Sequence, residues 1–347
     1  MKRILVTGSS GFIGASLVLR LLEGKEPLTI IGLDNMDSFY DPWLKEYRLK
    51  LIRNKVSDKS EQSFTFYKGS INDVDLLNTL FEEYRFDFVV NLAAQAGVRH
   101  SIDNPRIYME SNVMGFFHVL EACRQYGVKH LVFASSSSIY GNNVKVPFAV
   151  GDCADHPLSL YAATKKSNEL MAYCYAKLYG IPVTGLRFFT VYGPVGRPDM
   201  AYFSFTNKLL KNEVIQLYNH GNCSRDFTYI DDAVEGIVRV MSKVPDSSYA
   251  IYNIGSGRPV SISDFVQTLH EELLRAGVLA KDYDLEQHKQ LIGMQPGDVL
   301  ATFADTTALE CDLGFVPKTT LREGLCQFAT WYKAYYLEHF LNKVKPV

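Results

Sequence analysis

The strongest constraint on the fold lies at the start of the chain. The run from Arg3 to Gly8 is apolar and rich in β-branched residues, which is typical of a buried parallel strand. Gly11 and Gly14 follow, and apolar residues at helical spacing continue through Leu22. Glycines without Cβ atoms let the backbone approach a phosphate, and the start of a helix presents free N–H groups. The sequence therefore predicts a strand, a glycine turn and a helix that bind a dinucleotide.

A carboxylate in the right place supports the same prediction. The next predicted strand, Leu28 to Leu33, ends in Asp34, which comes twenty residues after Gly14. A carboxylate there accepts a hydrogen bond from a ribose 2′-hydroxyl and repels a 2′-phosphate, so it favours NAD over NADP. An aspartate that only ends a strand is the alternative. The spacing and the glycines together favour the cofactor.

The alternation of strands and helices continues along the chain. We expect a helix at 43–53, a strand at 63–69, a helix at 72–84, a strand at 86–94, a helix at 105–126 and a strand at 131–135. This order predicts the α/β class, with a doubly wound parallel sheet that binds its ligands at the carboxyl ends of its strands. Asp34, Ala93-Ala94-Gln95, the serines 136–138 and Phe188-Phe189-Thr190 all follow predicted strands.

Tyr161 and Lys165 are candidate catalytic residues on a helix predicted at about 160–178. Residues four apart share one helix face, so the phenol and the ammonium group can converge. A cation beside a phenol favours the phenolate and lowers its pKa, which suits a general acid or base for a substrate hydroxyl. Tyr173 and Lys177 repeat the spacing on the same helix, so the pattern alone is weak.

Composition excludes several other functions. The formal net charge is −2 and basic residues are scattered, which gives no attraction to nucleic acid or to an anionic membrane. Six widely spaced cysteines and eight histidines form neither a Cys-x-x-Cys nor a His-x-x-x-His pattern, so we expect reduced thiols and no metal. The chain shows no signal peptide and no long apolar run, and we expect a soluble, cytoplasmic protein.

The chain changes character at about residue 194. Pro194 to Pro198 is a predicted loop, and shorter elements with more turns follow to about 317. We expect a dinucleotide-binding domain at 1–193 that also holds Tyr161 and Lys165. The remainder, 194–347, is then mainly a smaller substrate lobe with segments that return to the first domain. A helix at about 321–340 is expected to pack across the outside.

In this order, the glycine loop, Asp34, the serine run and the Tyr161/Lys165 pair resemble the extended short-chain dehydrogenase/reductases that act on nucleotide sugars. The resemblance covers about residues 1–333 and is strongest to the UDP-glucuronate 4-epimerases. The segments that carry the closer resemblance are Ala93–Arg99, Arg187–Pro194, Gly196–Ala201, Arg225–Asp232 and Met294–Val299. Several long matches in one order make chance an unsatisfactory explanation.

The resemblance implies a reaction at C4 of a UDP-linked sugar. Tyr161 would take the 4-hydroxyl proton, Lys165 would lower its pKa and hold the nicotinamide ribose, and Ser136 would hydrogen-bond the 4-oxygen, with Ser137 or Ser138 assisting. Hydride would pass from C4 to NAD and return to the other face of the 4-keto sugar. UDP-glucuronate and UDP-galacturonate would thus be interconverted with no net redox change.

The resemblance also implies two sets of binding residues. The cofactor would contact Gly8, Gly11, Phe12, Ile13, Gly14, Asp34, Asn35, Ser70, Ile71, Leu92, Ala93, Ala94, Gln95, Asn112, Tyr161, Lys165 and Phe188. The substrate would contact Gln95, Arg99, Ser136, Ser138, Thr190, Arg197, Met200, Ala201, Arg225, Gln295 and Asp298.

Three of the substrate residues have specific implied roles. Thr190 and Arg197 resemble the family's holders of the sugar carboxylate, and a planar guanidinium can grip both carboxylate oxygens. Such a grip would suppress loss of CO2 from the 4-keto uronic acid, which is a β-keto acid. Arg225 resembles the residue that pairs with the UDP diphosphate; the alternative is a surface ion pair with Asp226.

Two departures from the family pattern concern the cofactor. Asn91 stands where the family usually has histidine, and Ser70 stands where an aspartate usually binds the adenine amino group. Serine can accept that hydrogen bond without charge. The resemblance further implies a homodimer formed through the helices at 105–126 and 160–178, and UDP-galacturonate suggests a supply of polysaccharide precursors.

Other functions on the same fold stay open. The 4,6-dehydratases and UDP-glucuronate decarboxylases carry an acidic residue in the segment that corresponds to Ser136–Tyr140, which has none here. A neutral UDP-sugar 4-epimerase is a second rival, against which Arg197 argues. A non-catalytic NAD-binding scaffold is the remaining alternative, but such a protein can lose Tyr161, Lys165 or the serine, and this chain keeps all three.

Overall fold

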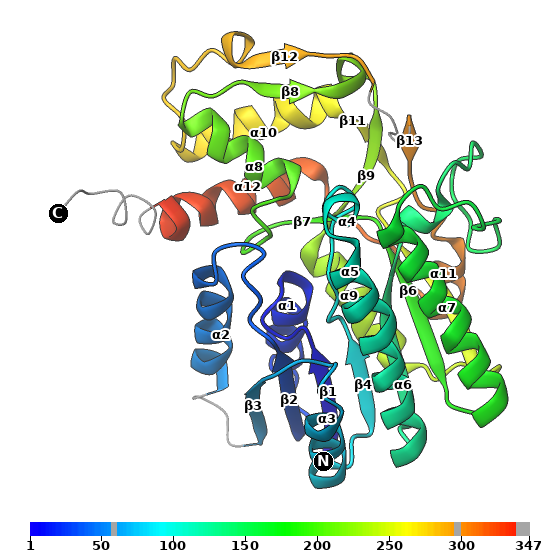
Figure 1. The fold of residues 1–347 in the computed structure, drawn as a ribbon. Helices are drawn as coiled ribbons and strands as arrows, with labels where there is room; N and C mark the ends of the chain where they lie inside the picture. Colours follow the sequence, from blue (N-terminus) through cyan, green and yellow to red (C-terminus); the bar gives the residue numbers. More distant parts are fainter. Residues whose placement is uncertain (57–60, 295–299, 338–347) are drawn as a thin grey trace.

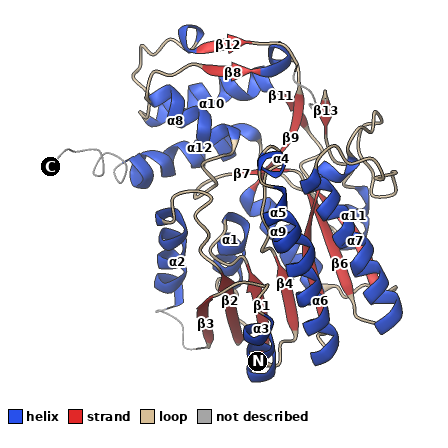
Figure 2. Ribbon diagram, viewed as in Figure 1, coloured by secondary structure: helices blue, strands red, loops and turns tan. Residues whose placement is uncertain are grey.

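The computed structural model describes residues 1–56, 61–294 and 300–337, and its centre is a seven-stranded sheet (Figures 1 and 2). Every neighbouring pair of strands in it is parallel. The predicted α/β class with a doubly wound parallel sheet is confirmed. The strands lie in the order β10 (Tyr249–Ile254), β6 (Val183–Phe188), β5 (His130–Ser136), β4 (Phe88–Asn91), β1 (Lys2–Thr7), β2 (Leu28–Asp34) and β3 (Gln62–Lys68).

Helices cover both faces of this sheet. Because side chains alternate along a strand, Ile4 and Val6 of β1 enter one core, while Leu5 enters the other. The first core contains α1 (Phe12–Leu21), α2 (Trp43–Val56) and α9 (Ile230–Ser242). The second contains α3 (Val74–Tyr84), α6 (Gly115–Tyr126) and α7 (Leu160–Tyr179).

A smaller lobe lies above the carboxyl ends of the large sheet's strands (Figure 1). Its centre is β9 (Ser224–Tyr229), which pairs with three other strands. These are β7 (Thr190–Tyr192), β11 (Pro259–Ser261) and β13 (Ala301–Thr302). The lobe is completed by β8 (Ile215–Leu217), β12 (Lys289–Leu291), α8 (Ala201–Leu210), α10 (Ile262–Ala276) and α12 (Leu321–Trp331).

Two segments from beyond residue 194 return to the first domain, one as a strand of its sheet and one as a helix that covers the sheet. β10 forms its edge by pairing in parallel with β6, and α9 packs against α1. The chain therefore passes from the sheet to the smaller lobe and back, which places the connections between the two near the carboxyl edge of the sheet. Within the described residues, no helix has the length and apolar character needed to cross a membrane.

The helix expected at 105–126 is interrupted. It consists of α5 (Pro105–Tyr108), a π-helical segment Met109–Met114, and α6, while the short α4 (His100–Asp103) precedes it. The helix expected at 321–340 is also interrupted. It is α-helical to Trp331 and continues as a π-helical segment to Leu337. Local periodicity predicted helix correctly in both places, but a π-turn has no signature in that periodicity.

Candidate active site

A cavity of about 600 Å³ opens at the carboxyl ends of the large sheet, below the smaller lobe. Most of the predicted site residues line it. They are Gly8, Gly11, Phe12, Ile13, Gly14, Asp34, Asn35, Ser70, Ile71, Leu92, Ala93, Ala94, Gln95, Arg99, Ser136, Ser137, Ser138, Tyr161, Lys165, Phe188, Thr190, Arg197, Met200 and Arg225. Gln295 and Asp298 lie outside the described residues. Ala201 and Asn112 do not line the cavity.

The three glycines form a tight turn between β1 and α1. Gly8 has a φ of 68°, and a Cβ on it would lie 2.8 Å from the backbone nitrogen of Ala93. A Cβ on Gly14 would lie 2.1 Å from the carbonyl oxygen of Gly8. The glycines are therefore required by the packing of the chain against itself as well as by any phosphate. Gly11, the N-cap of α1, has no side chain to cap the helix, so the first N–H groups remain available to an anion.

Asp34 lies where a ribose would be held. Its side chain is 7% exposed, and its two oxygens accept backbone N–H groups from Ser10 at 3.1 Å and Met36 at 2.9 Å. The Lys45 ammonium nitrogen lies 3.9 Å from the same carboxylate and is also buried. Each carboxylate oxygen can accept a further hydrogen bond. These groups fit the ribose of a dinucleotide.

Asn112 supports the backbone of Gln95 at the cavity wall. Its side chain is buried, accepts the Gln95 N–H at 2.8 Å, and donates to the Gln95 carbonyl at 3.0 Å and to the Thr164 hydroxyl at 3.1 Å. These bonds use its amide within the protein, and its contact with the cofactor stays a prediction. It lies in the π-helical segment and fixes the Gln95 backbone at the cavity wall.

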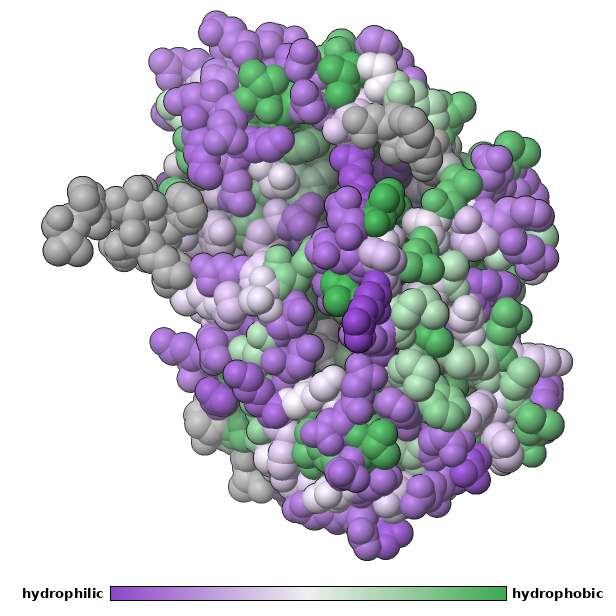
Figure 3. Space-filling view, in the orientation of Figure 1, coloured by the Kyte–Doolittle hydropathy of each residue, from purple (hydrophilic) through white to green (hydrophobic). Residues whose placement is uncertain are grey.

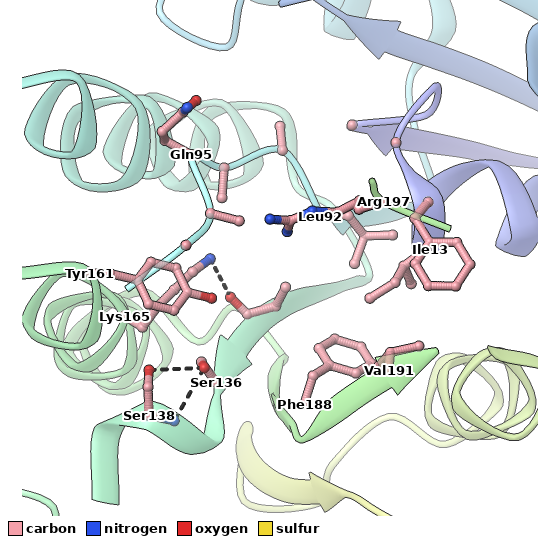
Figure 4. Close-up of a pocket in the computed structure, with 18 of the residues that line it drawn as sticks. Ile13, Leu92, Gln95, Ser136, Ser138, Tyr161, Lys165, Phe188, Val191 and Arg197 are labelled. Atoms are coloured by element: carbon pink, nitrogen blue, oxygen red, sulfur yellow. Dashed lines mark hydrogen bonds between the residues drawn. The ribbon is translucent and has the colours of Figure 1, made fainter. Parts of the chain in front are cut away.

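Tyr161, Ser136 and Ser138 lie together on one side of the cavity (Figure 4). Ser159 caps α7 by accepting the Ala162 N–H, so the helix begins just before Tyr161 and brings it beside the end of β5. The Ser138 hydroxyl donates to the Ser136 hydroxyl at 2.9 Å, and the backbone N–H of Ser138 donates to the same oxygen. The serine run is thus held in one arrangement facing Tyr161.

Lys165 is buried beside Tyr161 and is held by a backbone carbonyl. Its ammonium group donates to the Ala134 carbonyl at 2.9 Å and lies 6.0 Å from the centre of the Tyr161 ring. Burial lowers the pKa of Lys165 to about 8. Burial also raises the pKa of Tyr161, while Ser136 and the charge of Arg197 act in the opposite direction. The effect of Lys165 on the pKa of Tyr161 stays a prediction.

Arg197 enters the cavity from the side opposite Tyr161 (Figure 4). It leaves the loop between β7 and α8, and its guanidinium pairs with Asp199. Thr190, the first residue of β7, and Met200 also line this part of the cavity. A fixed cation thus faces a phenol and a hydroxyl across one cavity.

The region around Arg225 is organised by its neighbour. Asp226 is fully buried and accepts four hydrogen bonds of 2.7–3.0 Å, from the N–H groups of Ser256, Gly257 and Ala304 and from the Ser256 hydroxyl. The alternative of a surface ion pair between Arg225 and Asp226 is wrong, because this carboxylate is turned into the protein. Arg225 lines the cavity.

Sequence reasoning missed several residues at the cavity. Lys45, Tyr40, Phe39 and Asp199 line it together with the predicted residues. Lys45 lies in a charged helix, where charged residues usually face water, so its burial had no local signal. Asp199 had one weak signal, since a carboxylate two residues after Arg197 is placed to pair with it.

The comparisons with known proteins agree with this geometry. Residues 4–255 match the model of the NAD dependent epimerase/dehydratase family. The chain belongs to this family, and it is an enzyme that uses NAD as its cofactor.

Three similar proteins show which members of this family the chain resembles. Protein CapI of Staphylococcus aureus is 46% identical over 96% of this chain and 99% of its own length. UDP-glucuronate 4-epimerase 4 of Arabidopsis thaliana is 43% identical over 96% of this chain and 76% of its own. The crystal structure of UDP-glucuronic acid 4-epimerase from Bacillus cereus, in complex with UDP-glucuronic acid and NAD, has a TM-score of 0.84 and 31% identity, covering 95% of this chain and 99% of that one.

Proposed function

We propose that this enzyme interconverts UDP-glucuronate and UDP-galacturonate by inverting C4 of the sugar. The observation that carries the proposal is the position of Arg197, whose guanidinium enters the cavity opposite Tyr161 and Ser136 (Figure 4). A sugar with C4 beside the phenol would present its C6 carboxylate to that guanidinium. A neutral sugar would offer no carboxylate to the side of the guanidinium that Asp199 does not bind, so its N–H donors there would lose a charged acceptor.

The chain's own residues supply proton transfer and orientation. Tyr161 takes the proton of the 4-hydroxyl and later returns it, while Ser136, fixed by Ser138, hydrogen-bonds the 4-oxygen. When bound, NAD supplies the acceptor and then the donor of the hydride at C4. Lys165 is held by the Ala134 carbonyl at the floor of the cavity and fixes the ribose beside Tyr161. Of the predicted cofactor and substrate residues, those that line the cavity would contact NAD and the UDP-sugar respectively.

Thr190 and Arg197 bind the C6 carboxylate of the 4-keto intermediate and prevent its loss as CO2. Once C4 is a ketone, the uronic acid loses CO2 readily if the carboxylate turns out of its resting plane. A guanidinium that binds both carboxylate oxygens resists this rotation. Arg225, which lies in β9, binds the diphosphate of the UDP group. We assign 1–193 mainly to the cofactor and 194–347 mainly to the UDP-sugar, including Ala201, Gln295 and Asp298.

Incubation of the purified protein with UDP-glucuronate tests the proposal. Separation of the products is expected to show UDP-galacturonate, without UDP-pentose and without net NADH. UDP-pentose as the main product would identify a decarboxylase. Conversion of UDP-glucose to UDP-galactose in its place would identify a neutral-sugar epimerase, and NAD binding without any turnover would identify a scaffold. We place the reaction in the cytoplasm, as a source of uronic acid for polysaccharides.

We further propose a homodimer formed through α6 and α7. Exposed apolar side chains, among them Phe117, Leu170, Tyr173 and Leu178, lie on these two helices. Figure 3 shows hydrophobic residues gathered on the side of the molecule where α6 and α7 lie in Figure 1. A large exposed apolar patch is typical of a protein interface.

A charge in this patch is expected to prevent association. Leu170 is 57% exposed on α7, and Leu170→Glu should shift the mass measured by sedimentation from dimer to monomer, because burying an unpaired carboxylate is unfavourable. Val144 is 92% exposed and lies outside both helices, so Val144→Glu is the matched control and should remain dimeric. A wild-type protein that sediments as a monomer at all concentrations would contradict the proposal.

A further inference from the structure

The guanidinium of Arg197 is already held by another residue of the chain. Its Nε lies 3.0 Å from one carboxylate oxygen of Asp199, and its Nη2 lies 2.6 Å from the other. This is a two-point pair, which fixes the plane of the guanidinium as well as its position. Asp199 also lines the cavity, so the ion pair lies within the proposed substrate site.

The pair uses one edge of the guanidinium and leaves another. Arg has five N–H donors in a planar fork, and Asp199 takes the Nε–Nη2 edge. The Nη1 side of the fork stays available for a second carboxylate. Asp199 also partly neutralises the positive charge of Arg197. The guanidinium would therefore orient a substrate carboxylate more than it would strengthen its binding.

The loop that carries the pair is itself rigid. Val195 has a φ of 53°, which is unfavourable for a β-branched residue and persists only where the surroundings impose it. A Cβ on Gly196 would lie 1.6 Å from the Tyr202 hydroxyl, so the loop is packed tightly against α8. Backbone strain and close packing directly before Arg197 indicate a loop that is built for position.

A buried arginine accounts for this loop conformation. Arg48 of α2 is fully buried and donates to the carbonyls of Val195 at 2.8 Å and Gly196 at 2.9 Å. It also donates to the Ser10 carbonyl at 3.1 Å and to the Tyr40 hydroxyl at 2.6 Å. The backbone of Arg197 is thus fastened to the glycine turn, and its side chain is fastened to Asp199.

We propose that Asp199 is a positioning residue that determines whether the sugar keeps its carboxylate. By fixing the plane of Arg197, it fixes the plane of the C6 carboxylate bound to the free side of the fork. The inference rests on the proposed function. Without Asp199 the guanidinium turns more freely, and the carboxylate of the 4-keto sugar turns with it. The C5–C6 bond then breaks, CO2 leaves, and the electron pair of that bond forms an enolate that takes a proton at C5.

The experiment measures how the intermediate divides between two products. Asp199→Ala and wild-type protein are incubated with UDP-glucuronate labelled at C6, and released CO2 and UDP-galacturonate are both quantified. We expect the ratio of CO2 to UDP-galacturonate to rise at least tenfold in the variant. The Kd for UDP-glucuronate should stay within about threefold of wild type, because the cation is retained and the loss of its orientation is offset by the removal of a nearby negative charge.

A second variant and a control keep the test decisive. Asp199→Asn keeps the size of the side chain and loses the charge, so it should release CO2 at a level between those of the other two proteins, and it replaces Asp199→Ala if that variant does not fold. Asp103→Ala, at the end of α4 outside the cavity, should match wild type.

The two proposals fail in different ways. A wild-type protein that makes no UDP-galacturonate overturns the proposed function and this inference with it. Normal wild-type turnover with an unchanged product ratio in both Asp199 variants overturns the inference alone. A weaker Kd with no change in the ratio would reduce Asp199 to a structural role and also overturn it.

Discussion

Tyr161→Phe is expected to lower kcat for the epimerisation of UDP-glucuronate by about 10³-fold. Positioned general acid–base groups contribute roughly 10²–10⁴ to a rate, and the phenol hydroxyl lies beside Ser136 at the cavity (Figure 4). The ring stays in place, so the Kd for UDP-glucuronate should change little. Steady-state kinetics and titration calorimetry measure the two quantities separately.

Tyr173→Phe is the matched control for this substitution. Tyr173 lies on the same helix with a lysine four residues later, but it is 48% exposed and lies outside the cavity. Its variant should have the kcat of wild type. If Tyr161→Phe keeps more than a tenth of the wild-type kcat, the assignment of Tyr161 as the proton-transferring group is wrong.

Arg187→Leu is expected to lower the free energy of unfolding by about 3–5 kcal/mol. Arg187 is buried and makes two hydrogen bonds of 2.9 Å to the Glu169 carboxylate. It also donates to the Tyr140 hydroxyl and to the Val150 carbonyl. Removing the cation leaves a buried carboxylate that keeps the Ser135 hydroxyl as a donor and the Lys166 ammonium group at 3.7 Å. Urea unfolding followed by circular dichroism measures the change.

Two further variants test the cause of this loss. Arg106→Leu removes an arginine that is 89% exposed and paired with Glu110 one turn away, so its cost should be far smaller than that of Arg187→Leu. Adding Glu169→Leu to Arg187→Leu should recover part of the lost stability, because the buried carboxylate that lost its arginine is then gone. Equal losses in the buried and exposed single variants would contradict the argument.

The Arg187 network also concerns the site. Glu169 lies two turns beyond Tyr161 on α7, and Ser135, which donates to it at 2.7 Å, directly precedes Ser136. The pair therefore joins the helix that carries the phenol to the strand that carries the serines. This connection links residues 135, 169 and 187, whose separation in the chain hides it from any local pattern.

Local patterns in the sequence were enough to predict the fold class and the use of NAD. Gly8, Gly11 and Gly14 stand at the end of a β-branched run, and this short motif has one established backbone geometry. Asp34 follows from the same spacing rule. The strand and helix periods of about 2.0 and 3.6 residues are local properties, so the alternation that defines a parallel sheet was visible before any contact was known.

The packing of distant segments selects which of two equivalent patterns lies at the cavity. Tyr161 and Tyr173 have the same spacing to a lysine, yet one lies at the cavity and the other faces solvent. Asn112 lies behind the cavity wall, and the pKa of Tyr161 follows its burial more than the nearby Lys165. Arg48 reaches a loop about 150 residues away. Burial and long-range pairing depend on how distant segments pack, and spacing along the chain contains no record of that packing.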